Sequence, residues 1–142
     1  MLALPSMGSS QATLIGIDPG STCVGICTMQ VDLLTEQIIS TYAYTLHLDK
    51  LGGSEWMSDN YGDRFKRIAK LKECLYLIFQ ENSPLCISIE SPFFNRFRPQ
   101  AYGVLMEVMS SIREAVYVYD MWMIPYLIDP SSVKNAVGAH GA

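Results

Sequence analysis

The stretch LIGIDPGSTCVGIC, residues 14–27, puts an acid at the end of one apolar run and soon begins another. The runs over 12–17 and 23–30 contain several β-branched residues and are joined through Pro-Gly-Ser, which predicts a β-hairpin. Asp18 before Pro-Gly is an ordinary turn residue. A carboxylate at the end of a buried strand is nevertheless costly unless it is paired, hydrogen-bonded or bound to a cation. Asp18 is therefore the first candidate functional residue.

The rest of the chain shows three further strand patterns and three helical ones. Strands are expected over 36–46, 85–90 and 121–129, and helices over 61–80, over 100–119 and from Pro130 onward, with 51–60 as a loop. Asp129 is the expected N-cap of the last helix, because it precedes Pro130. This order of elements predicts an α/β fold in which a mixed five-stranded sheet is flanked by helices.

Asp18 and Glu90 are expected to meet at one edge of this sheet. Each ends a predicted strand, and strands joined by helical crossovers run parallel, whereas hairpin partners run antiparallel. Taken alone, Glu90 before Ser-Pro could simply face solvent. Two neighbouring carboxylates repel each other unless a cation neutralises them, and hard oxygen ligands suit Mg²⁺ or Mn²⁺. Two such ions about 3.5–4 Å apart would activate a water and stabilise a leaving oxygen in phosphodiester cleavage.

Composition indicates a single globular domain. A chain of 142 residues is long enough for a substantial core, and residues 1–11 are expected to be a flexible tail. Its apolar runs are shorter than the roughly 18–20 residues of a membrane helix, so no membrane partner is expected. The four cysteines lack C-x-x-C spacing and are interpreted as reduced, buried thiols of a cytoplasmic protein. The net charge of −4 does not favour nucleic-acid binding, although basic residues gather over 64–72 and 96–98.

The motifs IGIDPGSTCVGIC, ISIESPFF and VKNAVGAHG, with an apolar helix between the last two, resemble the RuvC-type Holliday junction resolvases of the RNase H-like superfamily. The resemblance spans roughly residues 14–142. It implies a homodimeric, Mg²⁺-dependent endonuclease that binds four-way DNA junctions and makes paired nicks. Asp18 and Glu90 match the family's first two catalytic acids, and Lys134 matches a lysine expected near the scissile phosphate. The helix over Gln100–Tyr119 matches the dimerisation helix, and its apolar residues on more than one side also indicate a second packing partner.

The loop after Glu90 is the expected DNA-binding element. Its aromatic and basic side chains suit stacking on unpaired bases and contact with phosphates. The candidates are Phe93, Phe94, Arg96 and Arg98. Phe93 matches a family aromatic that enters the junction, whereas Phe94 is equally well explained as a core residue. Lys66 and Lys70, on the basic side of the first helix, could follow a DNA arm or could simply face solvent.

The sequence departs from the family pattern at its carboxyl end. The resemblance implies two further acids, spaced D-x-x-D, on a C-terminal helix, and the sequence stops at GAHGA before such a helix. We therefore expect weak metal binding and little cleavage from these residues. Two other functions remain open: a non-catalytic, structure-specific DNA-binding module, and a fragment of an actin-like ATPase, whose first motif also has an acid followed by Gly-Ser-Thr. A junction nuclease would act in the cytoplasm or in another intracellular compartment that contains DNA.

Overall fold

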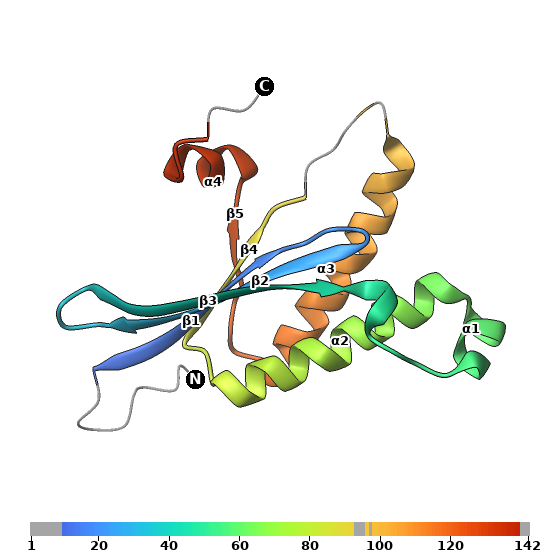
Figure 1. Cartoon of the computed structure of the whole chain (residues 1–142), viewed down its shortest axis with the longest axis horizontal. Coiled ribbons are helices and arrows are strands. Elements are labelled where there is room, and N and C mark those ends of the chain that lie inside the picture. The colour runs from blue at the N-terminus through green and yellow to red at the C-terminus, as the bar shows by residue number, and fades with distance from the viewer. Residues whose placement is uncertain (1–9, 93–95, 97, 140–142) are drawn as a thin grey trace.

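The computed structural model describes residues 10–92, 96 and 98–139. The strands and helices follow the predicted order, with one additional α-helix and a short 3₁₀ helix over Leu48–Lys50 (Figure 1). The elements are β1 (Gln11–Asp18), β2 (Cys23–Asp32), β3 (Gln37–His47), α1 (Glu55–Tyr61), α2 (Asp63–Asn82), β4 (Cys86–Glu90), α3 (Pro99–Tyr119), β5 (Tyr126–Ile128) and α4 (Pro130–Ala136).

The five strands form one mixed sheet in the order β3-β2-β1-β4-β5. The pairs β1–β2 and β2–β3 are antiparallel, whereas β1–β4 and β4–β5 are parallel. This arrangement confirms the predicted mixed sheet and the parallel pairing of the strands that end at the two acids. The strand directions follow from the connections between the strands. Short turns join the antiparallel pairs, whereas connections that contain α2 and α3 lead into the parallel strands β4 and β5.

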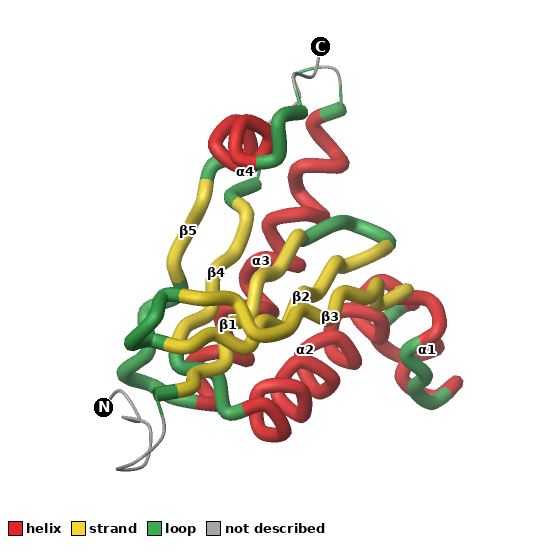
Figure 2. Tube along the Cα trace, turned by 60° about the vertical axis from the view of Figure 1, so that its left-hand side comes forward, coloured by secondary structure: helices red, strands yellow, loops and turns green. Residues whose placement is uncertain are grey.

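The core lies between one face of the sheet and the helices α2 and α3 (Figure 2). Alternate strand residues point to this face, and the helices contribute residues at spacings of three and four, as expected for amphipathic elements. The fully buried large side chains are Phe79, Ile15, Leu48, Leu71, Leu75, Ile87, Ile89, Ile112, Val24, Val108 and Val116. The Ser111 hydroxyl donates to the Ile68 carbonyl over 3.0 Å, so a buried polar group is satisfied where α3 crosses α2. Among the described residues, the opposite face of the sheet is open around Asp18 and Glu90.

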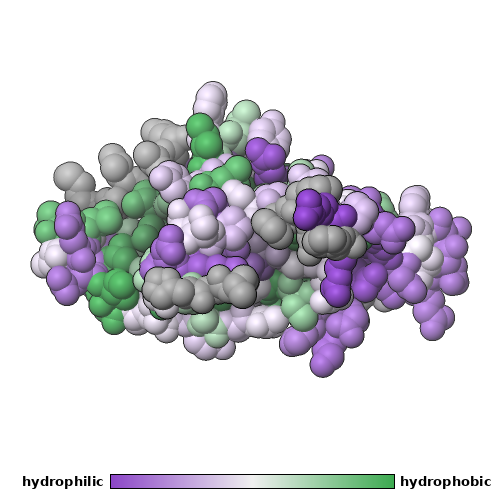
Figure 3. Space-filling view, turned by 90° about the horizontal axis from the view of Figure 1, so that it is seen from above, coloured by the Kyte–Doolittle hydropathy of each residue, from purple (hydrophilic) through white to green (hydrophobic). Residues whose placement is uncertain are grey.

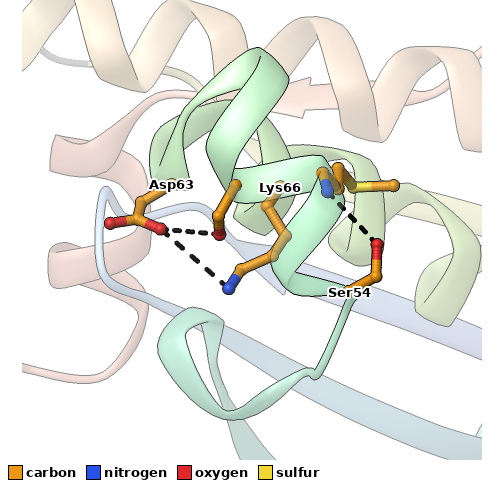
Figure 4. Close-up of polar contacts among 5 residues, drawn as sticks. Ser54, Asp63 and Lys66 are labelled. Atoms are coloured by element: carbon orange, nitrogen blue, oxygen red, sulfur yellow. Dashed lines mark hydrogen bonds and ion pairs between the residues drawn. The ribbon is translucent and has the colours of Figure 1, made fainter.

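The segment over 51–60 contains a helix, so its prediction as a loop was wrong. Ser54 caps α1, because its side chain accepts a hydrogen bond from the Met57 amide over 3.2 Å (Figure 4). Gly62, with φ at +89°, then separates α1 from α2. The expected helix over 61–80 therefore begins at Asp63. A Ser at the N-cap followed by Glu55 is the signal that the sequence offered for this short helix.

Two other boundaries differ from the predictions. Strand β5 covers only Tyr126–Ile128, because the Asp120 carboxylate accepts from the Trp122 amide in a turn and Pro125 has no amide hydrogen to donate. At the other end, β1 begins at Gln11, and the Ser10 carbonyl accepts from the Leu33 amide over 2.8 Å. Residues 10 and 11 of the predicted 1–11 tail are thus tied to the sheet, and its residues 1–9 lie outside the described residues.

The tip of the β2–β3 hairpin is apolar. Figure 3 shows hydrophobic surface gathered toward the left, where Figure 1 draws this tip. The exposed apolar side chains there are Leu33, Leu34, Ile38 and Ile39. Because Asp32 pairs with Gln11, this tip lies at the end of the sheet opposite the carboxyl end of β1. No helix in the described part of the chain is long and apolar enough to cross a membrane.

Candidate functional site

Asp18 and Glu90 lie together at the carboxyl ends of the adjacent strands β1 and β4, as the sequence predicted. Ile17 pairs with Ile89 in the parallel β1–β4 ladder, so the acids that follow them are in step on adjacent strands. Both acids line a cavity of about 480 Å³ on the open face. Asp18 is exposed, whereas Glu90 is half-buried. The carboxyl ends of parallel strands are the usual location of ligand sites in α/β sheets.

Small side chains form the floor of this cavity. They come from four neighbouring strands of the sheet and leave room above the backbone. The floor residues are Gly16, Gly25, Cys27, Ala43 and Ser88. The wall on the β5 side is made by Ile128 and by Val133 of α4. The cavity can therefore admit a group to the two acids from the open face of the sheet.

The pKa of Glu90 is raised above its ordinary value of 4.5. Burial of its carboxyl group is the largest cause, and repulsion by the Asp18 carboxylate is the second. Lys134 acts in the opposite direction and lowers this pKa. The three predicted catalytic residues are therefore close enough to interact electrostatically. An acid pair of this kind binds a proton or a cation more readily than an isolated carboxylate does.

Replacing Glu90 by Gln should stabilise the fold at pH 7. The raised pKa means that the folded state disfavours the ionised carboxylate, so wild type carries a penalty above the folded-state pKa. That penalty disappears below 4.5, where Glu90 is protonated in both states. The expected gain is at most about 0.5 kcal/mol, because solvent still screens a carboxylate that is only half-buried. Urea unfolding at pH 7 and pH 4 measures it, and a Glu90→Gln variant less stable than wild type at pH 7 would contradict it.

Asp129 is the N-cap of α4, which confirms that prediction. Its carboxylate accepts from the amides of Ser131 and Ser132 over 2.9 and 3.0 Å. The Ser131 hydroxyl first, then the Ser132 hydroxyl and the backbone donors, lower the pKa of Asp129 to about 2. Its oxygens are thus committed to the helix. The cap starts α4 immediately after β5 and so places Val133 against the cavity and Lys134 near Glu90.

Gly25 is a site residue that the sequence analysis missed. It lies opposite Asp18 in the β1–β2 ladder, and a Cβ at this position would lie 3.3 Å from the Asp18 Cβ. A glycine inside a strand pattern often marks such a close approach, which was the available signal. Gly25 thus leaves the space into which the Asp18 side chain fits.

Gly25→Val should displace the Asp18 carboxylate and weaken Mn²⁺ binding by about threefold to tenfold, since small misplacements of functional groups have large effects. Gly25→Ala should have a smaller effect, because the Asp18 side chain need shift by only a few tenths of an ångström to accommodate a single methyl group. Gly16→Ala is the matched control, since its Cβ would meet the Ser88 Oγ at an ordinary 3.6 Å. Titration of the three variants with Mn²⁺ tests the order; equal affinities for Gly25→Val and Gly16→Ala would refute it.

The predicted DNA-binding residues are only partly placed. Phe93 and Phe94 lie outside the described residues. Arg96 and Arg98 are exposed, and Arg98 immediately precedes α3. The DNA-binding role of these four residues stays a prediction.

Lys66 and Lys70 lie on α2 and do not line the acid cavity. The Lys66 ammonium lies 4.0 Å from the Asp63 carboxylate (Figure 4), and Lys70 lies 2.6 Å from Glu73. Acids one turn away therefore offset part of their positive charge. Their DNA-binding role also stays a prediction.

The arrangement of acids suits a hard divalent cation with an incomplete protein ligand set. Asp18 and Glu90 offer carboxylate oxygens, which Mg²⁺ and Mn²⁺ prefer, and such ions keep several waters or substrate oxygens. Within the described residues, no group of three or more His, Cys, Asp or Glu side chains is arranged to hold a metal ion. Asp18 and Glu90 are two acids and do not make up such a group by themselves.

The mixed sheet, its strand order and its flanking helices define an RNase H-like α/β fold. Thermus thermophilus RuvC in complex with a Holliday junction substrate superposes with a TM-score of 0.66 at 16% identity, covering 90% of this chain and 71% of that chain. A second Thermus thermophilus RuvC structure gives 0.62 at 20% identity, covering 92% and 72%. The yeast mitochondrial Holliday junction resolvase Ydc2 gives 0.56 at 12% identity, covering 94% and 61%. No protein-family model and no curated protein matches the sequence. The likeness to RuvC and Ydc2 is therefore one of fold.

Proposed function

We propose that this chain is the core of a Mg²⁺-dependent endonuclease that acts on four-way or other branched DNA junctions. The observation that carries the proposal is the position of Asp18 and Glu90 directly after the paired residues Ile17 and Ile89 of two parallel strands, within the fold of RuvC. Lys134, on the helix that follows β5, adds a positive charge beside this pair. An intracellular location follows from the proposed DNA substrate.

The two acids fit a divalent cation. Burial first, and then repulsion by Asp18, raises the pKa of Glu90, and a bound cation would remove that repulsion. Mg²⁺, or Mn²⁺ in its place, would be held by Asp18 and Glu90, with two ions in a complete site. When bound, such ions polarise a phosphodiester and activate water. Lys134 would attract the phosphate, and the small residues of the floor would leave room for the DNA backbone.

A homodimer would place two such sites on one junction. One side of α3 is buried against α2 and the sheet, through residues that include Val108 and Ile112. The opposite side is exposed along its length. Its residues at spacings of three and four are Gly103, Met106, Ser110, Arg113 and Tyr117. We propose that this side of α3 pairs with a second copy, which would provide the second nick.

A gel shift on a labelled four-way junction, with excess linear duplex as competitor, tests the proposed substrate. Ca²⁺ replaces Mg²⁺, so that binding is measured separately from cutting. We expect a junction-selective complex of the size of a dimer. Because α3 presents Arg113 on its exposed side, Arg113→Glu should weaken this dimer, while Lys50→Glu, at an exposed position on the 3₁₀ helix, serves as a charge-matched control. Equal displacement by duplex would contradict the proposal.

The same preparation separates the other two functions. A junction complex that neither Asp18→Asn nor removal of Ca²⁺ by a chelator alters would favour the non-catalytic DNA-binding module, whereas nicking by wild type in Mg²⁺ or Mn²⁺ would exclude it. Saturable ATP binding without junction binding would favour the actin-like ATPase fragment.

A further inference from the structure

A thiol and an imidazole lie side by side near the acid pair. Cys23 is the first residue of β2 and His47 the last of β3, and the two are direct partners in the antiparallel ladder. The Cys23 Sγ lies 3.3 Å from the His47 Nδ1, which is hydrogen-bond distance for sulfur. Cys23 is half-buried and His47 is exposed, so solvent and small molecules reach the pair.

This thiol–imidazole pair stands on the same open face as the candidate site. Successive strand residues alternate between faces, so Cys23 shares its face with Gly25 and His47 shares its face with Thr45. Gly25 and Thr45 both line the acid cavity, and Gly25 is the direct partner of Asp18. Cys23 is thus about 7 Å along β2 from the residue against which the Asp18 side chain packs.

The other cysteines are in different environments. Burial first, and then the charge of Glu81, raises the pKa of the Cys74 thiol, which keeps it protonated. Cys27 lies 4.0 Å from the Thr28 carbonyl, the outer limit of a sulfur hydrogen bond. Cys86 is exposed at the start of β4 and provides a reference for a solvent-accessible thiol. Among the described cysteines, Cys23 is therefore the one placed against a group that can take its proton.

We propose that Cys23 and His47 form a covalent modification site for hydroperoxides and soft carbon electrophiles. His47 takes the thiol proton, and the Cys23 thiolate attacks the terminal oxygen of a hydroperoxide. The sulfur–oxygen bond forms as the oxygen–oxygen bond breaks, so that sulfur loses two electrons and the peroxide gains them. The leaving alkoxide takes the proton from His47, which gives a sulfenic acid and an alcohol. With iodoacetamide, a sulfur–carbon bond replaces the carbon–iodine bond and iodide leaves.

Modification would act on the neighbouring site. A group attached to the Cys23 sulfur occupies the open face beside Asp18, where a DNA phosphate would approach. This consequence rests on the proposed function, whereas the thiol chemistry does not. Oxidation would thereby block junction binding. Two equivalents of a thiol would restore it: the first converts the sulfenic acid into a mixed disulfide and water, and the second releases the Cys23 thiol as a disulfide of the added thiol leaves.

Competitive labelling measures the reactivity. The folded chain is treated with limiting iodoacetamide, and the modified cysteines are quantified by peptide mass spectrometry. We expect Cys23 to react roughly tenfold faster than Cys86, since the His47 imidazole lies at hydrogen-bond distance from its sulfur and can accept the thiol proton as the sulfur attacks. His47→Gln, which keeps a polar side chain at an exposed position, should bring the two rates within about twofold of each other. Equal rates in wild type, or a Cys23 advantage that survives His47→Gln, would overturn the proposal.

A second measurement tests the blocking role. Alkylated wild type should lose the junction complex, whereas Cys23→Ser treated in the same way should keep it. Loss of the complex in both proteins, or in neither, would overturn the blocking role. A chain that shifts no junction before treatment would overturn the proposed function and with it the blocking role, while the labelling rates still decide the modification site.

Discussion

Asp18→Asn is expected to lower the affinity of the chain for Mn²⁺ by at least about tenfold, because the loss even of outer-shell partners of a metal costs that much. The neutral amide removes one of two negative charges and leaves Glu90 as the remaining acid at the edge. Mn²⁺ binding is best followed by the electron paramagnetic resonance signal of the free ion, which reports weak affinities directly. Asp59→Asn, at an exposed position on α1, is the matched control. Equal affinity in wild type and Asp18→Asn would place the cation elsewhere.

The pH dependence of the same titration identifies the second ligand. The pKa of Glu90 lies above 4.5, chiefly through burial and then through Asp18, so a proton competes with the cation at this carboxylate. Mn²⁺ affinity should therefore rise as pH increases through that raised pKa and level off above it. In Asp18→Asn the second of these causes is removed, which should move the rise to lower pH. An unchanged pH profile in Asp18→Asn would show that the two carboxylates do not interact.

The sequence was most informative where the chain alternates between strand and helix patterns. Asp18 and Glu90 each end an apolar run, and the connection through a helix required their strands to be parallel. Their juxtaposition could therefore be predicted without coordinates. Asp129 was equally accessible, because an acid before Pro130 has a local signature as an N-cap.

Features that depend on register and on short segments were not predictable in the same way. The role of Gly25 follows from its place opposite Asp18 in the ladder, and the contact of Cys23 with His47 follows from the pairing of β2 with β3. Neither pairing can be read from spacing along one strand. Helix α1 was missed because seven residues are too few for a clear periodic pattern, although Ser54 carries the capping signal.

Phe79→Ala is expected to remove about 3–5 kcal/mol of the free energy of unfolding, as for other buried aromatic side chains. Phe79 is 0% exposed and lies where α2 packs on the sheet, with its ring centroid 5.8 Å from that of Tyr119 on α3. One substitution therefore opens a cavity between both helices and the strands. Leu77→Ala, on the same helix but 57% exposed, is the matched control and should change stability by no more than about 0.5 kcal/mol. Urea unfolding followed by circular dichroism measures both.

The same variant separates the stability of the fold from the chemistry of the site. Phe79 lies on the helix-covered face, whereas Asp18 and Glu90 line the cavity on the open face. Domains of this size are stable by about 5–15 kcal/mol. A loss of about 3–5 kcal/mol therefore leaves most molecules folded only if the free energy of unfolding of wild type is well above the lower end of that range. Within that population, Mn²⁺ affinity should equal that of wild type. A loss of less than about 1 kcal/mol would mean that Phe79 does not fill the core in this way, and an altered affinity in the folded fraction would mean that α2 helps to hold the acids in register.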